Sequence, residues 1–182
     1  LSGTNNTYNG KTEIISGTLA LTGVSSLARS SLITVNAGGI LDASGRDDTT
    51  LTLASGQTLT GNGTVNGKVD VVGGAVLAPG KSIGDLTFGS DLNLKSGSAT
   101  VMKINKSVLP SNDVVRVAGN VVYGGTLIIT NLGATPFAAG DGFKLFAAAG
   151  YSGSFTNIVP AIPGINLAWE TNGLADGILN VV

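Results

Sequence analysis

The chain has 182 residues, 28 of them glycine, with no histidine, no cysteine and only 12% charged residues. Its net charge of −1, with lysine and arginine scattered singly, provides no basic stripe for a phosphate backbone and argues against nucleic-acid binding. The absence of cysteine excludes disulfides and thiol catalysis, and no apolar run approaches the roughly 20 residues of a membrane helix, so we expect no membrane span. The abundance of Val, Leu, Thr, Ser, Asn and Gly favours an all-β protein with short strands and tight turns.

A short unit recurs along the chain: a glycine, a small or polar residue, and then an alternation of aliphatic and other residues. Its spacing is loose but close to the length of one coil of a three-sided β-solenoid. Alternation at period two buries one face of a strand. The unit begins at Gly17, Gly39, Gly56, Gly74, Gly97 and Gly125, with further alternating segments at 51–53, 69–71, 86–88, 92–94 and 114–117.

Turn dipeptides follow almost every one of these segments, for example Gly38-Gly39, Asn66-Gly67 and Gly124-Gly125. Glycine reaches positive φ there at little steric cost. The same dipeptides would form hairpins in a β-sandwich, which is the alternative fold. The short strands and dense turns favour a right-handed three-sided β-solenoid instead, and no segment predicts a convincing helix.

We expect residues 1–182 to form a single solenoid domain, with regular coils over 1–105, a loop at 106–113, and C-terminal coils with a cap over 106–182. An open solenoid end exposes unpaired backbone and core, so a plug of large side chains is expected there. The aromatic residues that predict this cap are Phe137, Phe143, Phe146, Tyr151, Phe155 and Trp169.

Three segments resemble the passenger-associated β-strand repeat proteins of bacterial autotransporters. Residues 1–21 match at Tyr8, Gly10 and Gly17-Thr18-Leu19; residues 76–105 match most specifically at Ala78-Pro79-Gly80 and Ser82-Ile83-Gly84; and residues 111–158 continue the likeness. The resemblance implies a secreted, cell-surface β-helix protein of bacteria. The sequence stops at Val182 without the translocator barrel of that family, and it begins at Leu1 rather than Met, so we expect a processed, free-standing surface protein.

The sequence offers little for catalysis, and we expect a non-enzymatic protein with no catalytic, cofactor-binding or metal-binding residues. Nucleophilic triads need a base, usually histidine, and there is none. The carboxylates stand mostly singly, and Asp47-Asp48 beside Arg46 is the one adjacent pair. This segment is interpreted as a solvated loop, with a catalytic acid pair or a weak Ca²⁺ site as the alternatives.

Asparagines and tyrosines provide two further candidates. Asn36, Asn62, Asn66 and Asn93 could stack as amide ladders along the coils. Tyr8, Tyr123 and Tyr151 could bind sugars, although packing in the core or cap is favoured.

Three functions are therefore considered. The first is a structural subunit of a surface layer or filament that self-associates end to end through strand edges, with the terminal strand 178–182 and the opening strand around Leu1 taking part. The second is an adhesin that binds surface glycans or proteins. The third is a polysaccharide-active enzyme using Arg46, Asp47 and Asp48.

Overall fold

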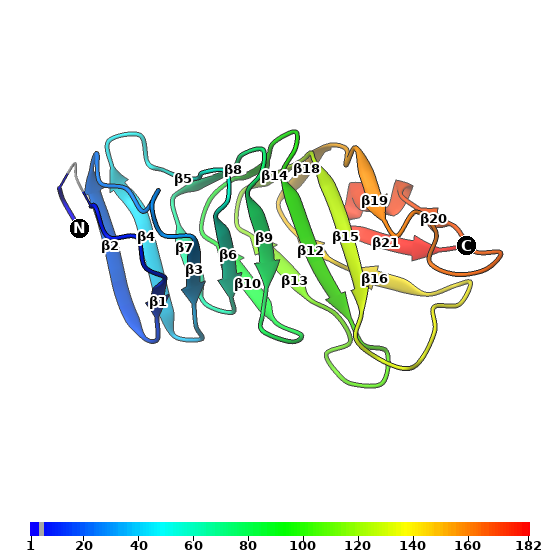
Figure 1. The fold of residues 1–182 in the computed structure, drawn as a ribbon. Helices are drawn as coiled ribbons and strands as arrows, with labels where there is room; N and C mark the ends of the chain where they lie inside the picture. Colours follow the sequence, from blue (N-terminus) through cyan, green and yellow to red (C-terminus); the bar gives the residue numbers. More distant parts are fainter. Residues whose placement is uncertain (4–5) are drawn as a thin grey trace.

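The computed structural model describes residues 1–3 and 6–182 and shows an all-β protein built on three parallel sheets (Figure 1). Sheet A contains β1 (Thr12–Ile14), β3 (Leu32–Val35), β6 (Thr58–Gly61), β9 (Val76–Pro79), β12 (Ala99–Ile104), β15 (Thr126–Asn131) and β19 (Asn157–Val159). Sheet B contains β2 (Gly17–Gly23), β4 (Gly39–Arg46), β7 (Thr64–Asn66), β10 (Asp85–Phe88), β13 (Val114–Val117) and β17 (Phe146–Ala147). Sheet C contains β5 (Thr50–Leu53), β8 (Lys68–Val71), β11 (Leu92–Leu94), β14 (Asn120–Tyr123) and β18 (Gly150–Gly153).

The chain visits these sheets in a repeating order. From β3 to β15 it passes through sheets A, B and C in turn, and each strand from β6 on pairs in parallel with the strand one coil earlier. The result is an elongated stack with the two termini at opposite ends (Figure 1). Parallel pairing between coils is the arrangement of a β-solenoid, so the solenoid prediction is confirmed at this level and the hairpin-based sandwich is excluded.

Inward-facing side chains align from coil to coil because strands of the same sheet stack in register. In sheet A, Ile33 stacks on Leu59 and Leu59 on Leu77. All three are fully buried, and burial of each such side chain stabilises the fold by about 1.5–3 kcal/mol. Thr100 interrupts this aliphatic row between Leu77 and Leu127, and its buried hydroxyl has no hydrogen-bond partner.

Corner glycines allow the coils to stack closely. Gly38, Gly67 and Gly125 have positive φ, as the turn dipeptides predict. Gly61 has φ +117°, and a Cβ there would lie 2.0 Å from the carbonyl oxygen of Val35 in the previous coil. A larger residue at position 61 would therefore force neighbouring coils apart.

The C-terminal end departs from the coil pattern. Sheet D is a small antiparallel sheet, and the single helix among the described residues is a short 3-10 helix, η1, where the sequence predicts none. None of the described helical structure is long and apolar enough to cross a bilayer. Sheet D contains β16 (Gly142–Lys144), β21 (Ile178–Val181) and β20 (Trp169–Glu170), and η1 spans Asn172–Asp176.

The position of β21 corrects one prediction. Residues 178–182 were expected to offer an open edge for assembly, but β21 is the middle strand of sheet D and is paired on both sides. Its backbone groups are used within the chain because β16 and β20 flank it. Buried Leu179 and Val181 pack into the core, with Phe143 beside them in the same hydrophobic cluster.

Candidate functional site

The acidic loop after β4 is held by its own residues. The Nε of Arg46 donates to Oδ1 of Asp48 at 3.0 Å, and the backbone N–H of Thr50 donates to the same oxygen at 3.0 Å. The hydrogen bond from Arg46 is the main cause that lowers the pKa of Asp48, with the Thr50 N–H assisting. Asp47 lies exposed beside it. The structure thus uses Asp48 to support a turn.

A shallow hollow of about 350 Å³ lies close to this loop, but neither Asp47 nor Asp48 lines it. Thr49 lines it and has a positive φ of 51°. The acidic residues that a polysaccharide-active enzyme would need are therefore not gathered in this hollow.

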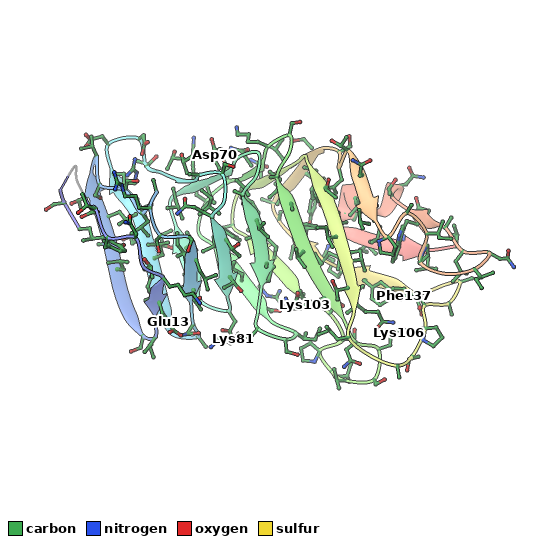
Figure 2. All side chains as sticks on the ribbon, viewed as in Figure 1. Glu13, Asp70, Lys81, Lys103, Lys106 and Phe137 are labelled. Carbon is green, nitrogen blue, oxygen red and sulfur yellow. The ribbon has the colours of Figure 1, made fainter. Side chains whose placement is uncertain are left out.

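Other charged side chains are spread along the stack. Figure 2 shows Glu13, Asp70 and Lys106 well apart from one another. Among residues 1–3 and 6–182, no cluster of three or more Asp or Glu side chains is arranged to hold a metal ion. Five of the carboxylates instead have a cation close by, as in the exposed pair of Arg116 and Asp85 at 2.6 Å.

One ion pair is buried. The Nζ of Lys103 on β12 lies 2.7 Å from Oδ2 of Asp113, whose side chain is fully buried. Asp113 also accepts the backbone N–H groups of Lys103 and Gly84, each at 2.8 Å. Burial raises the pKa of Asp113, and these hydrogen bonds oppose that rise. The pair joins the two ends of the loop between β12 and β13 and satisfies backbone donors, which is a structural role.

Two of the four candidate asparagines link neighbouring coils, and the four form no amide ladder within the described residues. Asn36 donates to Oε1 of Glu13 and Asn93 donates to Oδ1 of Asp70, both at 2.8 Å and both reaching the previous coil. No hydrogen bond joins the amides of Asn36, Asn62, Asn66 and Asn93 within the part of the chain that the structure describes.

The three candidate tyrosines separate into two places. Tyr8 is 40% exposed near the N-terminal end, where its hydroxyl lies 3.2 Å from that of Thr12. Tyr123 and Tyr151 stack at the other end with ring centroids 6.1 Å apart, and Phe155 lies 5.0 Å from Tyr123. The structure therefore gathers aromatic residues at the C-terminal end alone.

A groove of about 430 Å³ opens beside these rings. It lies between η1 on one side and the corner joining β18 to β19 on the other. Tyr151 and Phe155 line it as half-buried rings, and buried Leu174 of η1 lines it from the opposite side. Aromatic and aliphatic walls with a few polar groups are typical of small-molecule sites.

The opposite end of the stack has an open edge. The backbone N–H of Asn36 donates to the carbonyl oxygen of Ile14, so the backbone N–H and C=O groups of Ile14 point toward β3. In a parallel pair the next residue alternates, so the backbone groups of Glu13 point away from β3. Gly17 in β2 likewise donates to Gly38, which turns the backbone of Thr18 outward. We call residues 12–18 the N-terminal edge. Ile15 within it is 70% exposed.

Leu1 covers part of the neighbouring edge. Its carbonyl oxygen accepts the N–H of Thr22 at 2.9 Å, and its amino group donates to the carbonyl oxygen of Ala20. The opening residue is thus paired with β2 within its own chain. Leu1 therefore pairs with β2 at Ala20 and Thr22 and leaves residues 12–18, the N-terminal edge, uncovered.

The groove was not predicted from the sequence. Ser152, Ser154, Thr156 and Asn157 stand around Phe155, and this mixture of hydroxyls, an amide and a ring is a signal that could have drawn attention to it. The other wall, at Thr171 and Leu174, approaches only through the folding of η1 onto the last coil.

Positions 4 and 5 of the passenger-like segment 1–21 lie outside the described residues.

No family model and no curated protein matches this chain.

Proposed function

We propose that this chain is a non-enzymatic, extracellular structural protein of a bacterial surface, built as a right-handed three-sided β-solenoid. Three parallel sheets visited in a fixed order support three faces. Right-handedness is supported by the general rule that crossover connections between parallel strands of one sheet are right-handed in about 98% of cases. The scattered charges support a structural role, because an active site would gather them.

The observation that carries the proposal is the difference between the two ends of the stack. At the C-terminal end, sheet D and η1 fold over the last coils. At the N-terminal edge, Glu13 and Thr18 present backbone groups that have no strand beside them in the described structure. Unpaired strand edges readily add another strand.

We infer that a second copy pairs at this edge, so that two rods join end to end. The same edge on both subunits can meet about a twofold axis and form a closed, isologous contact. Ile15 lies on the edge with 70% exposure, and pairing would remove its side chain from water. Sheet D and η1 fold over part of the other end, where β19 remains the outer strand of sheet A, and we therefore place the contact at the N-terminal edge and expect pairs of rods in preference to a long filament.

Light scattering coupled to size-exclusion chromatography tests the proposal over a wide range of protein concentration. The unmodified chain should shift from monomer to dimer as concentration rises. Ile15→Lys should remain monomeric because a charged side chain would be buried at the contact. Ile165→Lys is the matched control, since Ile165 is 88% exposed in a loop near the other end.

A chain that stays monomeric at the highest concentration would contradict the proposal, as would an Ile15→Lys variant that dimerises like the control. Growth to fibres that Ile15→Lys abolishes would support end-to-end assembly but overturn the closed dimer.

Adhesion to surface glycans is a second candidate function, because the groove beside Tyr151 and Phe155 provides a specific place for a sugar.

A further inference from the structure

The walls of the C-terminal groove offer aromatic carbon surfaces. Tyr151 and Phe155 are half-buried and line it together with Ile158. The Tyr151 hydroxyl accepts the N–H of Ala148 at 2.9 Å and lies 3.3 Å from the carbonyl oxygen of Phe146, so this polar atom is already engaged inside the protein. What the ring contributes to the groove is therefore its apolar surface.

The rim of the groove is polar and uncharged. Its six polar residues are exposed, and their side chains make no hydrogen bond to protein atoms in residues 1–3 and 6–182. Glu170 is the acidic residue next to Thr171 of the rim. Its carboxylate accepts the N–H of Asn172 and the side-chain amide of Asn180, so it is already hydrogen-bonded within the C-terminal cap. The rim residues are Ser152, Ser154, Thr156, Asn157, Thr171 and Asn172.

Aromatic walls and an uncharged polar rim together favour one class of ligand. No lysine, arginine, aspartate or glutamate lines the groove, and the nearby Lys144 ammonium, 5.8 Å from the Tyr151 ring centroid, is bonded to the Asp176 carbonyl oxygen, so an ionic ligand would lose hydration there and gain little counter-charge. A purely apolar ligand would leave the hydroxyls and amides of the rim without partners. A pyranose ring fits both surfaces, since it presents C–H groups on a face and hydroxyls around its edge. The volume of about 430 Å³ lies within the roughly 300–1,000 Å³ usual for small-ligand sites.

We propose that the groove between η1 and the β18–β19 corner binds a neutral oligosaccharide, with a sugar face against Tyr151 and Phe155 and its hydroxyls bonded to the rim. This inference deepens the adhesin candidate and rests on it. A rod pair joined at the N-terminal edges would carry one groove at each outer end. Two grooves on one particle would strengthen attachment to a glycan surface through effective concentration.

Binding is tested with maltotriose, cellotriose and chitotriose as neutral probes and trigalacturonate as an acidic probe, using saturation-transfer NMR and calorimetry. The measurements use the Ile15→Lys background, so the outcome does not depend on assembly. At least one neutral trisaccharide should bind, and trigalacturonate should bind at least about tenfold more weakly.

Ser154→Arg places a long charged side chain in the groove without touching the core. It should weaken binding by about tenfold or more. Ser96→Arg is the matched control, because exposed Ser96 lies at the same kind of corner, between β11 and β12. Absence of binding to all three neutral probes would overturn the proposal. Binding that Ser154→Arg leaves unchanged, or an acidic probe that binds as tightly as the neutral ones, would overturn it too.

Discussion

The hydroxyl of Tyr123 donates a buried hydrogen bond of 3.1 Å to the carbonyl oxygen of Leu174, which ties the last coils to the helix that covers them. Burial, and to a lesser degree the nearby Tyr151, raises the pKa of Tyr123, so the hydroxyl keeps its proton and remains a donor. The two residues are 51 positions apart, and both line the groove. This contact therefore helps to hold η1 against the groove, together with the hydrogen bonds from Leu145 and Phe146 to the Gly177 carbonyl oxygen.

Tyr123→Phe should lower the free energy of unfolding by about 1 kcal/mol, because the Leu174 carbonyl loses one buried hydrogen bond and keeps only the one from the Gly177 N–H. Urea unfolding followed by circular dichroism measures the change. Tyr8→Phe is the control and should change stability by less than about 0.5 kcal/mol, since its hydroxyl lies near the surface. Equal effects from the two variants would show that the Tyr123 bond contributes nothing special.

Thr100→Val should stabilise the protein by about 1 kcal/mol. The Thr100 hydroxyl is buried without a partner between aliphatic neighbours, and valine has nearly the same shape without that polar atom. Thermal unfolding of both proteins gives the difference. Thr60→Val should not stabilise, since the Thr60 hydroxyl donates to the Gly80 carbonyl oxygen at 3.3 Å. A destabilised Thr100→Val would mean that this hydroxyl has a partner in solution.

Asp113→Asn should destabilise the fold by about 3–5 kcal/mol. The substitution leaves the mostly buried Lys103 ammonium without its counter-charge, at the point where the loop between β12 and β13 closes. Asp85→Asn, which breaks the solvent-exposed pair with Arg116, should cost less than about 1 kcal/mol. Denaturant titration of the two variants and the unmodified chain measures both losses in free energy of unfolding. Similar losses would contradict the distinction between buried and exposed pairs.

Acid should weaken the attachment of the segment before β16. Partial burial raises the pKa of Asp141, but the hydrogen bonds from Lys106 and the Ala138 N–H outweigh it and hold the pKa below its usual value of 3.8. A carboxylate with a lowered folded-state pKa contributes stability above its unfolded pKa, and this contribution is lost as pH falls through the folded value. The stability difference between the unmodified chain and Asp141→Asn should thus be present at pH 7 and shrink below about pH 4.

Unfolding curves at pH 7 and pH 3 measure this difference, with Asp47→Asn as an exposed control. A difference that persists unchanged at pH 3 would show that the loss comes from packing instead of charge.

The regular coils follow from local pattern. Leu51-Thr52-Leu53 and Val69-Asp70-Val71 predict strands because alternation at period two is complete within a few residues, and they lie in β5 and β8. The pairing of these strands could also be predicted from the sequence, since a repeating unit stacks on the previous copy of itself.

The C-terminal end could not be predicted in the same way. Phe143 in β16 pairs with Leu179 in β21, and nothing in either segment specifies so distant a partner or an antiparallel direction. The groove depends on the same folding event, because Leu174 reaches Tyr123 only after η1 has turned back on the coils. Pairs such as Lys103 with Asp113 were missed because one residue lies in β12, the other ends the loop that follows, and no repeat relates them.

Cysteine cross-linking tests the central claim most directly, since the natural chain has no cysteine and every cross-link must come from an introduced one. Ser16→Cys places a thiol on the N-terminal edge, and Ser154→Cys places one on another exposed site at the opposite end. Under mild oxidation, we expect Ser16→Cys to form a disulfide-linked dimer rapidly and Ser154→Cys to form none, although its N-terminal edges still associate without a covalent bond. Failure of Ser16→Cys to cross-link, or faster cross-linking of Ser154→Cys, would contradict end-to-end pairing at the N-terminal edge.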